Sequence, residues 1–103
     1  MSFRMHFHDL PHSNFLEETC QRMSQELQDE FPEMVKVEVT HTQSGLQRET
    51  IVHVTGKDID LASTAQSKDS RESVSEAFER LRRQLRKHHD KQIFTRRRHA
   101  RAR

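Results

Sequence analysis

The chain has 103 residues and a formal net charge of +2, with 33% charged residues, 31% hydrophobic residues and no Trp or Tyr. This length suits one domain with a modest core, and the low apolar content argues against a large ligand-enclosing cavity. No apolar run approaches the roughly 18 residues of a membrane span, the N-terminus lacks a signal-peptide pattern and the single cysteine excludes an internal disulfide, so we expect a cytoplasmic protein.

The first third of the chain predicts a strand followed by a helix. Residues 3–8 alternate apolar and polar side chains, which is typical of a half-buried strand. Residues 14–31 place apolar side chains three and four positions apart, which predicts an amphipathic helix that Pro32 ends. Ser13 or Asn14 can cap its start. Its apolar stripe comprises Phe15, Leu16, Thr19, Cys20, Met23 and Leu27.

The middle of the chain predicts three strands joined by short turns. They are expected over residues 34–42, 48–55 and 59–66. Gly45 and Gly56 lie in the two turns between them. The first of these strands should bury Val35, Val37 and Val39, which alternate with polar residues.

The last regular element is a helix that begins near Asp69 or Ser70. Its expected buried stripe comprises Val74, Ala77, Phe78, Leu81 and Leu85. The helical pattern fades after Asp90, and we expect residues 92–103 to form a flexible basic tail.

The element order is strand, helix, three strands and helix, which favours an α+β fold. We expect a two-layer sandwich in which both helices pack on one face of a four-stranded sheet, as in double-stranded-RNA-binding domains. The first helix permits a parallel, right-handed crossover between the first two strands, and the last three strands form a meander. Residues 1–91 would make up this domain.

Charges are distributed unevenly along the chain. Residues 80–103 contain eleven lysines and arginines and one acid, whereas residues 1–79 contain seven lysines and arginines and fifteen acids. An acidic body with a strongly basic end favours a polyanionic partner, with nucleic acid as the first candidate and an anionic membrane as the second. Because Arg holds phosphate with a planar fork and Lys acts as a mobile point charge, the basic end suits RNA.

The candidate RNA-binding residues on the last helix are Arg80, Arg82, Arg83, Arg86, Lys87, His88, His89 and Lys91. Residues 80, 83 and 87 are expected to line one side of the helix, and residues 82, 86 and 89 another. Further RNA contacts are considered for the tail residues Arg96, Arg97 and Arg98, whose alternative role is long-range attraction of RNA.

Other kinds of chemistry find little support in the sequence. With two glycines the chain has no Gly-rich phosphate loop, and it has no Gly-x-Ser-x-Gly nucleophile motif. Cys20 lacks the pattern of a catalytic cysteine and is expected to be a packed hydrophobic residue. His6, His8 and His53 should share the outer sheet face, but zinc needs three or four converging ligands. We therefore expect no catalytic residue, no metal and no cofactor, and histidines that are exposed or face RNA.

The end of the last helix carries a recognisable pattern. The helix opens with Asp69 and closes with Leu-x-x-Gln-Leu-x-Lys-x-x-Asp-Lys, formed by Leu81, Gln84, Leu85, Lys87, Asp90 and Lys91. Together with residues 37–39 and 50–64, this ending resembles the ribosome hibernation promoting factor (HPF/YfiA) family, which was once labelled sigma-54 modulation protein. The resemblance covers roughly residues 3–91, and the element order agrees with it.

Some positions depart from the family pattern. Arg71 stands where members usually have Tyr, and Ser73-Val74-Ser75 stands where Ala-Ile-Asp is common. The first helix of members usually carries basic residues in its second half, whereas here Arg22 is its one basic residue and acids surround it.

The resemblance implies a function without catalysis. Family members bind the small (30S) ribosomal subunit and its 16S rRNA, across the channel used by messenger RNA and by the A- and P-site transfer RNAs. They inhibit translation and preserve ribosomes under stress or in stationary phase. For this chain the resemblance implies a short-type factor that is a monomer off the ribosome, with no membrane partner and no small-molecule substrate.

Two alternatives to ribosome hibernation remain open from the sequence. The chain would be a general structured-RNA-binding module if the fold recognises RNA by shape alone. It would be a regulatory protein-binding domain if the acidic first helix is its binding surface.

Overall fold

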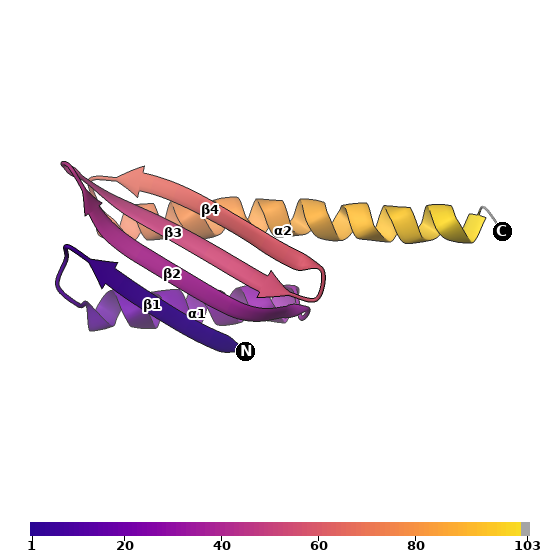
Figure 1. The fold of residues 1–103 in the computed structure, drawn as a ribbon, viewed down its shortest axis with the longest axis horizontal. Coiled ribbons are helices and arrows are strands. Elements are labelled where there is room, and N and C mark those ends of the chain that lie inside the picture. Colours follow the sequence, from indigo (N-terminus) through magenta and orange to yellow (C-terminus); the bar gives the residue numbers. More distant parts are fainter. Residues whose placement is uncertain (102–103) are drawn as a thin grey trace.

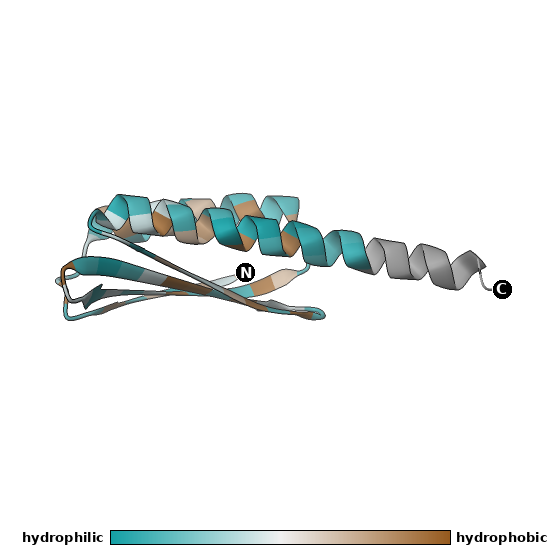
Figure 2. Ribbon diagram, turned by 90° about the horizontal axis from the view of Figure 1, so that it is seen from above, coloured by the Kyte–Doolittle hydropathy of each residue, from teal (hydrophilic) through white to brown (hydrophobic). Residues whose placement is uncertain are grey.

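The computed structural model describes the backbone of residues 1–101 and the side chains of residues 1–91. The elements are β1 (Ser2–His8), α1 (Asn14–Glu30), β2 (Met34–Ser44), β3 (Gln47–Gly56), β4 (Ile59–Ser67) and α2 (Ser70–Arg101). The strands form one sheet in the order β1-β2-β3-β4, and both helices lie on the same face of it (Figures 1 and 2). The predicted α+β, two-layer fold is therefore confirmed.

The sheet has one parallel and two antiparallel pairings. β1 runs parallel to β2, so that Met5 pairs with Val39, and α1 makes the crossover between these strands. β2, β3 and β4 form the predicted antiparallel meander. Gly45 has a φ of 61° in the β2–β3 turn, a left-handed conformation that glycine adopts without a Cβ penalty.

A β-bulge at the start of β2 corrects one prediction about the core. Val35 was expected to be buried, but it is 59% exposed. Met34 pairs with Gly56 and Lys36 with Thr55, so Val35 is an extra residue in this strand. Met34 is 1% exposed and fills the position on the helix-covered face. At the same place the β3 backbone passes close to the residue before β2, because a Cβ on Gly56 would overlap the carbonyl oxygen of Glu33.

The core lies between the helices and the sheet. α1 begins at the predicted cap, where the Leu16 N–H donates to Ser13 Oγ at 3.2 Å. The buried residues of α1 are Leu16, Cys20, Ser24 and Leu27. Phe15, predicted to belong to this stripe, is instead 58% exposed. Burial raises the pKa of the Cys20 thiol to about 12, which agrees with the prediction of a packed hydrophobic residue.

The buried stripe of α2 is as predicted, but the end of the helix is not. Val74, Ala77, Phe78, Leu81 and Leu85 all belong to the core. The helix continues to Arg101 instead of fading after Asp90, since no Gly or Pro follows Ser70 and Arg, Lys and Gln favour helix. Leu85 is the last core residue of α2, and the C-terminal part of the helix projects past the sheet (Figure 1). The expectation of a tail without regular structure from residue 92 is thus wrong, and the proposed domain boundary at residue 91 falls inside α2.

A buried polar cluster ties the start of α2 to the sheet. His41 is 1% exposed, and its Nδ1 lies 2.9 Å from Thr50 Oγ1 while its Nε2 lies 3.0 Å from Ser70 Oγ. Thr50 Oγ1 in turn lies 2.8 Å from Ser73 Oγ. Burial, together with the nearby charge of Arg48, lowers the pKa of His41. The expectation that the histidines are exposed or face RNA is therefore wrong for His41, which is an uncharged core residue near neutral pH.

Candidate nucleic-acid interface

The predicted arginines and lysines of α2 lie on its solvent side, in a stretch that we call the α2 cationic segment (residues 80–91). Because Leu81 and Leu85 are buried against the sheet, the intervening arginines and lysines are held outward. The side chains of Arg83 and Arg86 are 75% and 64% exposed. Lys87 is exposed and makes no hydrogen bond or ion pair with the residues whose side chains are described. The segment therefore presents positive charge on a rigid helix.

One side of this segment is paired with acids of the same helix. The Arg80 guanidinium lies 2.5 Å from Glu76 Oε1, and it also donates to the carbonyl oxygen of Thr64 at 2.6 Å. Arg83 lies 3.6 Å from Glu79 Oε1. These are exposed ion pairs one helical turn apart, which contribute at most about 1 kcal/mol, so a phosphate can replace either acid at little cost.

The other side of the segment turns toward the end of α1. Glu30 accepts from Arg86 at 2.9 Å, and its second oxygen lies 3.3 Å from Arg82 Nε. Glu33 lies 3.4 Å from His89 Nδ1. The two sides predicted from helical spacing thus exist, but the second is partly neutralised by acids of the first helix and of the loop after it.

The remaining predicted contacts differ in how they are presented. His88 is half-buried, and its Nε2 is buried without a hydrogen-bond partner among the described residues, so this atom does not face outward. His89 is half-buried beside the Phe31 ring, with the ring centroids 6.2 Å apart. Lys91 is exposed on the same helix. The side chains of Arg96, Arg97 and Arg98 lie outside the described residues.

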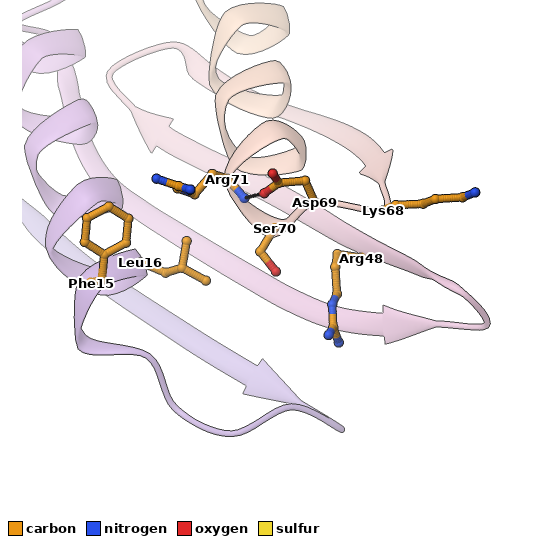
Figure 3. Close-up of a pocket in the computed structure, with 7 residues that line it drawn as sticks. All are labelled: Phe15, Leu16, Arg48, Lys68, Asp69, Ser70 and Arg71. Carbon is orange, nitrogen blue, oxygen red and sulfur yellow. Dashed lines mark hydrogen bonds between the residues drawn. The ribbon is translucent and has the colours of Figure 1, made fainter.

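A cationic region at the other end of α2 was not predicted. We call it the Phe15 cleft, a depression of about 550 Å³ lined by Phe15, Leu16, Arg48, Lys68, Asp69, Ser70 and Arg71 (Figure 3). The Arg71 guanidinium lies 5.8 Å from the Phe15 ring centroid. Asp69 Oδ1 accepts from the Arg71 backbone N–H at 2.8 Å and caps the helix. The sequence does not predict this cleft, because Arg48, Lys68 and Arg71 are not contiguous in the chain and come together only in the folded structure.

The face of the sheet away from the helices carries mixed charges. The predicted outer histidines do share this face, and the rings of His6 and His8 stack with centroids 6.5 Å apart. His53 pairs with Asp60 at 2.6 Å. The hydrogen bond and charge of Lys36 lower the pKa of Glu38. Among the described residues no group of three or more His, Cys, Asp or Glu side chains is arranged to hold a metal ion.

Two comparisons with known proteins agree with this architecture. A family model described as sigma 54 modulation protein / S30EA ribosomal protein matches residues 3–93. A ribosomal subunit interface protein from Coxiella burnetii superposes with a TM-score of 0.81 at 19% identity, covering 87% of this chain and 99% of that one. The N-terminal domain of Thermus thermophilus Protein Y superposes with a TM-score of 0.73 at 13% identity, covering 82% and 93%. No curated protein sequence matched the chain.

At these identities the two solved structures establish the shared fold alone, whereas the family model spans most of the chain. No described helix has an apolar stretch of the length that a bilayer crossing needs.

Proposed function

The chain belongs to the sigma 54 modulation protein / S30EA ribosomal protein family, and from this membership and the α2 cationic segment we propose that it is a ribosome hibernation factor. It binds the small (30S) ribosomal subunit through 16S rRNA, across the channel for messenger RNA and the A- and P-site transfer RNAs. It inhibits translation under stress or in stationary phase, acts in the cytoplasm as a monomer off the ribosome and catalyses no reaction.

The observation that carries this proposal is the outward cationic face of α2. Arg83 and Lys87 lie one turn apart on a helix whose buried stripe prevents it from rotating, so their charges keep a constant spacing. Ribosomal RNA offers a dense array of phosphates, and contacts to phosphates supply affinity and position but little sequence information. Selectivity then comes from the shape of the folded RNA that the domain fits.

The domain boundary is part of the same proposal. The hydrophobic core extends from Leu16 to Leu85, and we assign residues 1–91 to the ribosome-binding domain. The part of α2 after Lys91 extends the positive charge of the helix, because it carries four further arginines and no acid. We assign Arg96, Arg97 and Arg98 to supplementary phosphate contacts.

Inhibition of cell-free translation, combined with cosedimentation with 30S subunits, tests the proposal. We expect inhibition at stoichiometric protein, and release of the protein when messenger RNA and transfer RNA are added in excess, because they occupy the same channel. No inhibition at a molar excess over ribosomes would overturn the proposal.

Binding to free duplex RNA separates the proposal from its alternatives. A hibernation factor binds a short RNA duplex more weakly than the 30S subunit, since the duplex lacks the shape of the channel. Equal affinity for both would identify a general RNA-binding module instead. Failure to bind either RNA would favour a protein-binding domain, with the exposed acids of α1 as the docking surface.

A further inference from the structure

Beyond the α2 cationic segment, the geometry of the Phe15 cleft points to a second RNA contact, and we infer that it holds one unpaired nucleotide. This inference rests on the proposed function and adds a contact at the opposite end of the helix. The cleft is a shallow depression of about 550 Å³ that is open to solvent.

The first element of the site is an aromatic ring left open to solvent. Phe15 is 58% exposed, whereas Phe31 and Phe78 are each 3% exposed. Among the phenylalanines whose side chains are described, Phe15 is the one that neither belongs to the core nor packs against it. An exposed ring offers a flat surface on which an unpaired base can stack, and such stacking tolerates any base.

The second element is the arginine beside this ring. Figure 3 shows the Arg71 side chain directed toward Phe15, and its guanidinium carbon lies 5.8 Å from the ring centroid. Arg71 forms no ion pair with the described residues, so no acid among them compensates its charge. A planar guanidinium adds both a stacking surface and a positive charge to a base-binding site.

The third element is positive charge for the phosphate. Arg48 lies on the far side of Ser70 from Phe15 (Figure 3), and it donates a hydrogen bond to the neutral side chain of Gln43. Lys68 is exposed at the edge of the cleft, and its side chain extends away from Phe15 (Figure 3). Asp69 is the one acid in the lining, and its Oδ1 is occupied by the backbone of α2. The cleft thus has a base-stacking part and a phosphate-binding part, as a nucleotide requires.

The occupant is an unpaired nucleotide of RNA. A base inside a duplex is stacked and paired, so its face is not available to Phe15, whereas loops and bulges expose such faces. Arg71 and Lys87 are separated by roughly 24 Å along α2, from a rise of about 1.5 Å per residue. A folded RNA can span this distance, so one RNA reaches both the cleft and the α2 cationic segment.

A tryptophan placed at position 15 tests the stacking directly. Since the chain has no Trp or Tyr, the emission of a Phe15→Trp variant reports on this cleft alone. We expect a single-stranded RNA oligonucleotide to quench this emission, and a duplex of the same sequence to quench it much less. The matched control is Ala62→Trp, which places the reporter on the exposed sheet face away from the helices, where we expect no quenching.

Affinity measurements with substitutions of Phe15 test the energetics. We expect Phe15→Leu to weaken binding of single-stranded RNA roughly tenfold, and Phe15→Tyr to bind like the wild type, because stacking needs an aromatic ring. Both variants are checked by thermal unfolding, and Phe15→Leu keeps an apolar side chain at the start of α1. Wild-type affinity in Phe15→Leu would overturn the inference, as would equal quenching in Phe15→Trp and Ala62→Trp. If a free mononucleotide quenched the Phe15→Trp emission as strongly as the single-stranded RNA oligonucleotide does, the assignment of the site to RNA would also be overturned.

Ribosome binding separates failure of this inference from failure of the proposed function. If the wild type cosediments with 30S subunits but Phe15→Trp emission does not respond to RNA, the inference about the cleft is overturned and the proposed function stands. If the wild type does not cosediment, the proposed function itself is overturned.

Discussion

At the scale of single residues, burial decides which side chains remain available for function. His41 and Cys20 are the kinds of residue that often carry chemistry, yet both are enclosed in the core. Burial disfavours the imidazolium of His41 and the thiolate of Cys20, so each is held in its uncharged form near neutral pH. Phe15 is the opposite case, an apolar residue that the core leaves outside.

The pKa of His41 has a consequence for the pH dependence of stability. Because its pKa is lowered in the folded state, the unfolded chain binds a proton more readily, and acid favours unfolding. The stabilisation by neutral His41 is complete above its ordinary pKa of about 6.5 and is lost as the pH falls below that value. We expect urea unfolding at pH 7.5 and 5.5 to show this loss in the wild type and a smaller loss in His41→Gln.

The His41→Gln variant should also be less stable at pH 7.5, by about 1–3 kcal/mol, because Thr50 or Ser70 loses a buried hydrogen-bond partner. His8→Gln is the control, since His8 is exposed on the outer sheet face. If His41→Gln showed the same acid loss as the wild type, His41 would not be the group responsible.

At the scale of elements, the packing of α1 beside α2 determines which arginines of α2 are neutralised by acids of α1. The end of α1 brings Glu30 against Arg82 and Arg86, while Arg83 pairs with Glu79 of its own helix and Lys87 is exposed. The two sides of α2 therefore have different roles. The outer side, with Arg83 and Lys87, is available to bind phosphate. On the inner side, with Arg82 and Arg86, a phosphate must first displace the carboxylate of Glu30.

The outer side of α2 is tested by charge reversal. We expect Arg83→Glu with Lys87→Glu to weaken 30S binding at least tenfold without changing the unfolding temperature, because both side chains are exposed. The matched control is Arg4→Glu with Lys57→Glu, which makes the same charge change at exposed positions away from α2. Unchanged cosedimentation of the α2 variant would remove this surface from the interface.

The acid at the end of α1 is tested by neutralisation. We expect Glu30→Gln to tighten RNA binding roughly threefold, because it releases two arginines from an exposed ion pair that contributes less than about 1 kcal/mol. Glu26→Gln removes the same charge one turn earlier, where the carboxylate forms no ion pair with the described residues, and it should have a smaller effect in the same titration. An equal increase in RNA affinity in both variants would mean that the affinity depends on the net charge of the protein and not on the ion pairs of Glu30.

At the scale of the whole molecule, positive and negative charges are separated in space. Residues 1–69 carry twelve of the sixteen acids, whereas α2 carries most of the lysines and arginines. The C-terminal part of α2 extends past the edge of the sheet (Figures 1 and 2). Such a distribution orients the molecule in the field of a polyanion, so that α2 approaches first. Binding through it should depend strongly on salt.

The salt dependence gives a quantitative test. If about five to seven phosphates are neutralised, the logarithm of the affinity should fall against the logarithm of salt concentration with a slope near −4 to −6. The measurement is a series of 30S-binding titrations between low and physiological salt. A slope near zero would show that the positive charge of α2 does not carry the binding.

The sequence by itself determined the element order, the α+β class and the buried stripe of α2. Apolar residues repeat every two positions in a strand and every 3.6 positions in a helix when one face of the element is buried. It also located the α2 cationic segment, since those charges are contiguous in the chain, and its pattern indicated the family that the match over residues 3–93 confirms.

Only the tertiary structure decided what depends on contacts between distant residues. The bulge at Val35 arises from the register with β3, and the burial of His41 depends on Ser70 and Thr50. Residues from separate elements likewise meet at Glu30 and in the Phe15 cleft. The end of α2 differs from its prediction because the buried apolar stripe ends at Leu85, while the residues that follow still favour helix. The period of apolar residues indicates which face of a single helix or strand is buried. The features above depend instead on the side chains and backbone that a neighbouring element places against that face.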